Sequence, residues 1–477
     1  MISILFSLLS PFRAYVFFLI FLILLFSFFE SFGLALLLPL LENILKENSA
    51  TPLTGIINGV FDFLNINKTL SAIGILFITI IILKNLLKIS SQYFNTKIVF
   101  NIRKYWMLKI NNNYLYSPYG NIIKEKQGVL VNNLVFETQK AANGILKINE
   151  FLISACMVIS YIALMFLVDP KIALIALFVF GTIFSLTSYL GKNKLADYGR
   201  KELIINQETN AVASENISAM RQVRTFSIEK KIGNKLNEYL NTLTSISVKY
   251  EFIKSIPKSV VEVITFIIII SIVVFLEKDN PNTLRSYIPI LSIFILTAQR
   301  LLGQFNLLIS TKYSFDFYRP TFQLINSLIQ SADIIDSKQL SNNKPDIHNI
   351  DSDIVFKDVS FFYKKKKKVL NKINMKIKKG KISAIFGPSG SGKSTIADLI
   401  LGLYVPTKGS IYVNGSNLSK FSLSSWRSCI GFVSQDNYLF HESIIENIKI
   451  GKPDATMNEV VESVKKAQAY EFIKNLP

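Results

Sequence analysis

The sequence predicts a two-part protein: an all-α membrane domain of six transmembrane helices with long cytoplasmic helical extensions, followed by an incomplete α/β domain. Three observations predict this class. Half of the 477 residues are apolar and fall into long uncharged blocks, basic residues concentrate in alternate connectors, and a strand–glycine loop–helix pattern follows residue 380. We expect the membrane domain over residues 1–320, a linker over 321–350 and the α/β domain over 351–477. This much hydrophobicity argues against an ordinary soluble enzyme.

The apolar blocks define the six predicted spans. A helix needs about 20 apolar residues to cross the hydrocarbon core of a bilayer. The blocks at 151–168 and 172–191 are long enough to span without including a charge. The others reach that length by including one flanking charge, which can extend to the interface. The first block is too long for a cleaved signal peptide, which is the alternative explanation of an apolar N-terminus. We expect spans at about 12–41, 69–97, 145–168, 171–191, 254–276 and 286–312.

Charge asymmetry predicts the orientation of these spans. The connectors 84–140 and 192–262 hold twenty-one Lys and Arg, whereas the other three connectors hold five. The positive-inside rule then places both long connectors and both termini in the cytoplasm. Much of the net charge of +20 therefore reflects membrane topology, not nucleic-acid binding. Both long connectors look helical, and we expect them to reverse direction at Tyr116–Gly120 and near Asn210–Arg221.

The chain changes character after about residue 318. A polar stretch, 331–352, is typical of a linker, and alternating apolar residues then predict strands near 354–363 and 369–377. Five lysines, Lys364–Lys368, lie between these strands. Because no aromatic residues are interleaved with the lysines, we interpret them as a solvated hairpin turn in preference to a nucleic-acid site.

A glycine-rich loop is the strongest functional signal. Residues 381–386 form a predicted apolar strand, and Ile396–Gly402 a predicted helix. Between them lies G-x-x-x-x-G-K-S, the P-loop pattern. Its glycines let backbone N–H groups surround a phosphate at a helix N-terminus. Lys393 then reaches the β- and γ-phosphates, and the Ser394 hydroxyl binds Mg²⁺. The predicted ATP-binding loop comprises Gly387, Pro388, Ser389, Gly390, Ser391, Gly392, Lys393, Ser394 and Thr395.

Beyond the loop, Gly409–Gly415 is a predicted hairpin strand, and Ile430–Asp436 is a predicted buried strand that contains Gln435 near its end. Together with the six predicted spans, this arrangement resembles an ABC exporter half-transporter over essentially the whole chain. The resemblance implies that Gly387–Thr395 is the Walker A loop and that Tyr363 stacks on adenine. It also implies that Gln435 occupies the Q-loop position, where it touches Mg²⁺ and the attacking water.

The membrane part shows a further likeness. Residues 215–229, written E-N-I through R-T-F to Glu229, are similar to the second intracellular loop of the family. The resemblance implies that short coupling helices at the tips of both extensions press on the nucleotide domains. It also implies a second half-transporter as partner, which we expect to be an identical copy.

The sequence departs from the family pattern in its last part. It contains no L-S-G-G-Q signature, no apolar strand ending in Asp-Glu after the P-loop, and no switch histidine, since His348 and His441 are its only histidines. We therefore expect the chain to be C-terminally truncated, to bind ATP weakly at best and not to turn it over. Hydrolysis in this family needs the missing base and the partner's signature loop.

Two charged residues within the spans are candidates for a substrate cavity. Glu30 lies in the first span and Arg300 in the sixth, and such charges generally face a water-filled cavity or a partner. Glu30 is about 25 Å along its helix from Arg13, so interfacial snorkelling is an equal alternative. A cationic cavity at Arg300 would suit a pyrophosphate-linked lipid.

The transported substrate is the least determined feature. The first and sixth spans are similar in part to bacterial flippases of lipid-linked oligosaccharides. We therefore expect ATP-driven export or flipping of a lipid-linked or other amphiphilic substrate in the bacterial inner membrane, with membrane lipids as partners and no nucleic acid. A multidrug or lipid exporter of the same architecture is the alternative. A non-hydrolysing membrane regulator or degenerate partner subunit is the alternative of another class.

Overall fold

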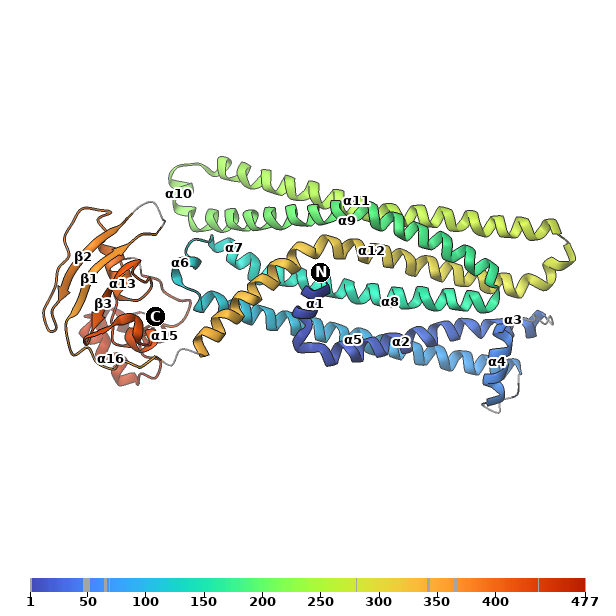
Figure 1. Cartoon of the computed structure of the whole chain (residues 1–477), viewed down its shortest axis with the longest axis horizontal. Helices are drawn as coiled ribbons and strands as arrows, with labels where there is room; N and C mark the ends of the chain where they lie inside the picture. The colour runs from blue at the N-terminus through green and yellow to red at the C-terminus, as the bar shows by residue number, and fades with distance from the viewer. Residues whose placement is uncertain are drawn as a thin grey trace. The chain divides into compact units, whose positions relative to one another are not determined.

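A computed structural model shows two compact units, Met1–Ser341 and Asn342–Pro477, which we describe separately (Figure 1). The structure describes residues 2–45, 52–63, 67, 69–279, 281–340, 344–363, 368–435 and 437–476, and within these ranges some side chains of the membrane helices are left out. The first unit is all-helical and the second combines a sheet with helices, so the predicted fold class is confirmed.

Long helices form the first unit. The predicted first span is interrupted at Leu36, so it appears as α2 and α3. The helices are α1 (Ile2–Leu9), α2 (Arg13–Ala35), α3 (Leu37–Leu45), α4 (Pro52–Phe63), α5 (Leu70–Tyr116), α6 (Tyr119–Ile122), α7 (Gln127–Val131), α8 (Thr138–Val168), α9 (Pro170–Ser218), α10 (Met220–Thr225), α11 (Glu229–Asp279) and α12 (Pro281–Leu340), with a 3-10 turn at Ser10–Phe12 and a π-helix at Asn132–Glu137.

Four helices in the described residues are long and apolar enough to cross a membrane: Ile4–Glu42, Leu70–Tyr116, Gln127–Val168 and Ser292–Ile334. The other two predicted spans, 171–191 and 254–276, lie in the helical backbone of α9 and α11. Many side chains in those two stretches lie outside the described residues, so the total of six stays a prediction.

The surface of α5 explains why this unit needs a membrane. Ile75, Ile78 and Ile82 recur at helical spacing and are each more than half exposed. An apolar stripe of this kind is unfavourable in water and compatible with lipid. On their inner faces the helices pack apolar side chains against one another. One buried cluster joins α2, α8, α9, α11 and α12 and includes Tyr161 and Phe305.

The far ends of the long helices reverse direction in two places. α5 ends at Tyr116, and Ser117-Pro118 turns the chain into α6, as the sequence predicts. The second reversal was predicted near Asn210–Arg221, and α9 does end within this range, at Ser218. The short α10 follows, and the chain completes the turn after it, where Ser227 has a left-handed φ of +52°.

The predicted linker also differs from the structure. Residues 321–340 continue α12, which runs beside α8 and α5 (Figure 1). The reason is packing: Phe322 and Ile325, three residues apart on one helix face, are fully buried in a cluster with Trp106. After α12, the backbone is irregular from Lys344 to Ser352, and residues 341–343 lie outside the described residues.

An antiparallel sheet organises the second unit. Its order is β2-β1-β3-β4, with all three pairs antiparallel. The predicted strands near 354–363, 369–377 and 409–415 are therefore present, and the lysine run lies in the β1–β2 connection, mostly outside the described residues. The elements are β1 (Ile354–Phe361), β2 (Leu370–Ile377), α13 (Lys393–Ile400), β3 (Lys408–Val413), β4 (Ser416–Asn417), a 3-10 turn (Leu418–Lys420), α14 (Leu423–Ser428), α15 (Ile444–Lys449), α16 (Met457–Lys466) and α17 (Tyr470–Lys474).

Two predicted strands, 381–386 and 430–436, are not formed in the described residues. A central strand is stable only when its backbone pairs with neighbouring strands. Among residues 344–363, 368–435 and 437–476 no strand pairs with either segment. Their side chains are accordingly not buried: Phe386 is 90% and Val433 87% exposed. Both segments have the apolar pattern of a strand, but in the described residues no neighbouring strand pairs with them.

Candidate nucleotide-binding site and membrane charge cluster

The glycine-rich loop leads directly into α13. The N–H of Ser391 donates to the Pro388 carbonyl at 3.2 Å, which closes a turn, and Gly392 then adopts a left-handed φ of +94° as the cap of the helix. α13 begins at Lys393. The first N–H groups of a helix have no carbonyl partner within it, and together with the helix dipole they favour an anion.

Lys393 holds its charge over this loop. Its Nζ donates to the carbonyl oxygens of Gly387 at 2.7 Å and Pro388 at 2.9 Å. Residues 387–391 are exposed, so the loop and the ammonium group are open to a phosphate. The arrangement therefore brings together a cation, a left-handed glycine and a helix N-terminus, which are the components of a phosphate site.

The residue after Lys393 is suited to bind a Mg²⁺ ion that a nucleotide brings with it. Ser394 is exposed, whereas Thr395 is 4% exposed and faces the core. Within the described residues no group of three or more His, Cys, Asp or Glu side chains could hold a metal ion. Mg²⁺ commonly binds through one protein oxygen and the phosphates of a nucleotide. The exposed Ser394 hydroxyl suits that mode.

Tyr363 is tied to the P-loop helix. Its hydroxyl lies 3.0 Å from the Thr395 hydroxyl. Its ring packs edge-on against Phe361 at 5.0 Å and Tyr404 at 5.3 Å, and the residue is 44% exposed. The phenol is thus positioned by three neighbours while part of the ring stays accessible.

The structure does not bring Gln435 into this site. Gln435 is exposed, and the segment leading to it forms no strand. No hydrogen bond joins it to the P-loop in the described part of the chain. Its predicted role at Mg²⁺ depends on a strand that is not formed here.

Glu30 and Arg300 lie together, although they are 270 residues apart. Glu30 is 6% exposed, so it does not snorkel. One oxygen, Oε2, accepts from Lys84 Nζ at 2.5 Å. The other, Oε1, lies 3.4 Å from the Tyr161 hydroxyl, which donates to it, and 3.7 Å from Arg300 Nη1. We call these four residues, from α2, α5, α8 and α12, the Glu30 cluster. Sequence analysis found two of its members and missed Lys84 and Tyr161.

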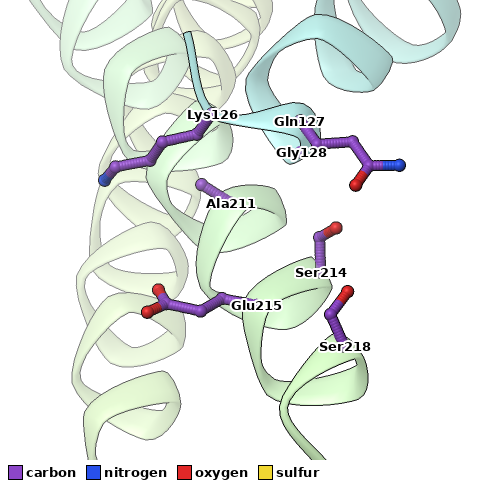
Figure 2. A pocket seen from close by; sticks show the side chains of 7 residues that line it. All are labelled: Lys126, Gln127, Gly128, Ala211, Ser214, Glu215 and Ser218. Carbon is purple, nitrogen blue, oxygen red and sulfur yellow. The ribbon is translucent and has the colours of Figure 1, made fainter. Parts of the chain in front are cut away.

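A second polar site lies where α7 meets α9 (Figure 2). It is a cavity of about 270 Å³, lined by Lys126, Gln127, Gly128, Ala211, Ser214, Glu215 and Ser218. Lys126 forms an ion pair with Glu208 at 2.7 Å, and that hydrogen bond raises the pKa of Lys126. In Figure 2 the hydroxyls of Ser214 and Ser218 point to the same side of α9, and the Glu215 carboxylate points to the other.

Comparison with known families agrees with both halves of this description. Residues 14–301 match the ABC transporter transmembrane region, and residues 370–477 match the ABC transporter family. The chain belongs to the ABC transporter family. The match to the transmembrane region alone covers more than half of its length.

Two relatives of this ABC transporter chain have names that combine ATP binding with a permease. YgaD of Bacillus subtilis, provisionally named a multidrug export ATP-binding/permease protein, is 29% identical over 66% of this chain and 54% of its own length. A Staphylococcus aureus protein with the same provisional description is 26% identical over 94% of this chain and 76% of its own. The aligned part thus spans about half the length of the first of these relatives.

A solved structure shows the same fold. The structure of a bacterial Atm1-family ABC exporter with ATP bound aligns with a TM-score of 0.75 and 17% identity, covering 98% of this chain and 79% of that one. At this identity the likeness concerns the fold alone. It agrees with a long-helix membrane unit followed by a partial α/β unit.

Sequence analysis of this ABC transporter chain missed the residues that form hydrogen bonds with the C-terminal end of α13. The Trp426 indole donates to the Ile400 carbonyl at 2.6 Å. The Arg427 guanidinium donates to the carbonyls of Leu401 at 3.0 Å and Gly402 at 2.9 Å. These bonds satisfy carbonyls that a helix C-terminus leaves free. The two residues follow the P-loop by more than 30 positions, and no spacing rule connects them to it.

Asp398 is a further residue that sequence analysis missed. It lies on α13, one turn after Ser394, and partial burial raises the pKa of its carboxyl, whereas a hydrogen bond with Tyr363 lowers it. Asp398 therefore helps to hold the tyrosine beside the loop.

Proposed function

We propose that this chain is part of an ATP-driven exporter of amphiphilic molecules, of the multidrug or lipid class. The observation that carries the proposal is the phosphate-site geometry at Gly392 and Lys393 in the same chain as a long-helix membrane unit of the ABC family. The multidrug names of the relatives support this class. They give no support to a lipid-linked oligosaccharide as substrate, for which the one favourable observation is the cationic Arg300.

At the nucleotide site, each residue would have a separate task. When bound, ATP supplies the free energy of nucleotide binding and of phosphate transfer to water, and Mg²⁺ neutralises its phosphates. The α13 N-terminus and the loop N–H groups hold the phosphates, and Ser394 donates a metal ligand. Lys393 exchanges the carbonyls of Gly387 and Pro388 for phosphate oxygens. Because that exchange replaces neutral acceptors by charged ones, it favours binding.

Tyr363 and Gln435 would complete the site. The accessible part of the Tyr363 ring can stack on adenine, while its hydroxyl bond to Thr395 keeps the ring in place. Gln435 would reach Mg²⁺ and water only after its segment pairs as a strand. We propose that this happens in a longer protein with a second half-transporter, and that the second copy is identical.

In the cell, we propose a multi-pass protein of the bacterial inner membrane. The N-terminus, both helical extensions and the nucleotide unit would be cytoplasmic, because the basic residues concentrate on that side. The short helices α6 and α10 would then lie on the cytoplasmic side of the membrane.

The nucleotide site can be tested with the 477-residue chain in detergent. A fluorescent ATP analogue with Mg²⁺ should bind, and Lys393→Ala should weaken binding roughly tenfold or more, the loss of one charge-assisted interaction. Lys201→Gln, an exposed charge removal on α9, is the matched control. Equal binding by the Lys393→Ala variant would contradict the assignment. Mg²⁺-dependent hydrolysis above the Lys393→Ala background would contradict the expectation that this chain does not turn over ATP.

The substrate class needs a protein that includes the signature and Walker B segments. In proteoliposomes, multidrug-type amphiphiles should stimulate its ATPase activity more than lipid-linked glycans do. The opposite order would restore the flippase interpretation. A protein that binds ATP but neither hydrolyses it nor responds to any amphiphile would support the regulator alternative.

A further inference from the structure

The Glu30 cluster has more positive than negative charge. Two cations, Lys84 and Arg300, face one carboxylate, Glu30. The two partners are not equivalent. Lys84 is 2.5 Å from Oε2 and its side chain is 17% exposed, whereas Arg300 is 3.7 Å from Oε1 and its side chain is 60% exposed. At that separation Arg300 makes an ion pair but not a well-formed hydrogen bond. Arg300 is therefore the loosely held cation of the cluster.

Buried hydroxyl groups without partners lie next to these charges. Ser27 is one turn before Glu30 on α2 and is 2% exposed, and Thr297 is one turn before Arg300 on α12 and is fully buried. Neither hydroxyl has a hydrogen-bond partner within the described residues. Residues three positions apart share a helix face, so both hydroxyls lie on the faces that carry the charges. Buried hydroxyls without partners are costly and are normally explained by a ligand or water.

The cluster lies deep within the helices. Glu30 is 15 residues from the end of α3 and Lys84 is 14 residues from the start of α5, which places both about 21–23 Å from the same end of the unit. Buried apolar residues of the same helices, Phe26 and Leu301 among them, form one continuous core. A charge at such a depth is retained where it faces a partner or a binding cavity.

Arg300 lies on a helix face that the described chain leaves uncovered. Leu296 is 41% and Leu307 is 47% exposed on the same stripe of α12, and Gly303 adds no side chain between them. The guanidinium thus emerges from an apolar stripe. In the described part of the chain its ion-pair partner is the distant Glu30 oxygen.

We propose that the Glu30 cluster is a binding site for the anionic headgroup, a phosphate or sulfonate, of an amphiphilic substrate. Arg300 and Lys84 receive the headgroup, the Ser27 and Thr297 hydroxyls donate to it, and the apolar stripe of α12 takes the chain. Glu30 is a positioning residue that holds Arg300 until the headgroup replaces it. The proposal rests on the export function above and specifies its substrate class. A cationic substrate fits less well, because Glu30 already faces two cations.

The test measures binding alone, without ATP hydrolysis. The 477-residue chain is placed in phosphatidylcholine nanodiscs, and fluorescence titration measures the Kd of a dansyl-labelled dodecyl phosphate. A dansyl-labelled dodecyl maltoside and a dansyl-labelled dodecyltrimethylammonium serve as neutral and cationic comparisons. The phosphate probe should bind tightest of the three. Arg300→Gln should raise its Kd roughly tenfold or more, and Arg300→Lys should recover part of that loss.

Glu30→Gln gives the result that a merely structural role would not give. Removing the competing carboxylate should lower the Kd of the phosphate probe by about threefold or more, whereas structural damage would raise it. Lys201→Gln should change nothing. If the Glu30 variant does not fold, as shown by its circular dichroism, the Arg300 pair still decides, because that exposed side chain is not needed for packing.

Several outcomes would overturn the proposal. These are equal affinity for the three probes, preference for the ammonium probe, an unchanged Kd in Arg300→Gln, or a raised Kd in a folded Glu30→Gln variant. Displacement of the probe by inorganic phosphate at similar concentrations would show a free-anion site in place of a headgroup site. Failure of ATP binding with normal probe selectivity would refute the proposed function and leave this site standing. Normal ATP binding without probe selectivity would do the reverse.

Discussion

The two left-handed glycines of the P-loop are expected to respond differently to the same substitution. Gly392 has φ +94° and Gly390 has φ +81°, so alanine at either position costs about 1–2 kcal/mol of backbone strain. A Cβ at Gly392 would also lie 2.7 Å from Leu370 Cδ2, whereas a Cβ at Gly390 meets no atom within 4 Å. Carbon atoms pack best at about 3.5–4.0 Å, so Leu370 must move.

The structure sets the magnitude of this second effect. Leu370 is 2% exposed and belongs to the core of the second unit, so it has little room to move. Overpacking of this kind costs about 1–3 kcal/mol. Gly392→Ala should therefore lower the free energy of unfolding by about 2–5 kcal/mol, and Gly390→Ala by about 1–2 kcal/mol.

Tryptophan fluorescence can measure the difference. The sequence has two tryptophans, and Trp426 is buried in the second unit. In a Trp106→Phe background, denaturant unfolding followed at Trp426 reports this unit. Leu370→Ala should remove the clash, so the double variant with Gly392→Ala should lose less than the sum of the two single losses. Equal losses at Gly390 and Gly392, or simple additivity with Leu370→Ala, would refute the reasoning.

Two further predictions concern other contacts. Gly128→Ala should destabilise the first unit by about 1–3 kcal/mol, because its Cβ would lie 2.4 Å from the Asn210 carbonyl oxygen. Gly233→Ala, in open space on α11, should be neutral or stabilising. Thermal unfolding of both variants in detergent measures the difference, and equal shifts in Tm would contradict the contact at Gly128. The Lys452 hydrogen bond helps to lower the pKa of Glu459 from 4.5 to about 2, so its support of α16 is complete above pH 4.5 and is lost as the pH falls through 2. Hydrogen exchange of α16 should show this loss in the parent chain and not in Glu459→Gln; the same acid response in both would contradict it.

The P-loop is a structure that the local sequence pattern predicts. A left-handed cap followed by Lys393 and a helix is a short-range structure, since the hydrogen bonds of Lys393 join carbonyls only five and six residues away. The pattern alone therefore predicts its geometry. The same holds for the hairpin of β1 and β2 and for the turn after Tyr116.

The predictions that were wrong concern structure that depends on distant residues. Segments 381–386 and 430–436 have the apolar pattern of buried strands, but a strand also needs partners, and none pairs with them in the described residues. The linker prediction failed for a similar reason. The polarity of residues 331–340 suggested irregular structure, whereas α12 stays packed into that region: Ser331 accepts a hydrogen bond from Asn113 at 2.8 Å, and Ala332 is 1% exposed.

Sequence by itself determined the class of this protein: long apolar helices, an asymmetric distribution of basic residues, and a phosphate loop. These follow from hydrophobicity, charge and backbone sterics, which act over short stretches of chain. Tertiary structure decided that Glu30 is buried and shared by Lys84, Tyr161 and Arg300, and that Trp426 and Arg427 support α13. No pattern in the chain encodes these contacts, because helix packing brings together residues that are tens to hundreds of positions apart.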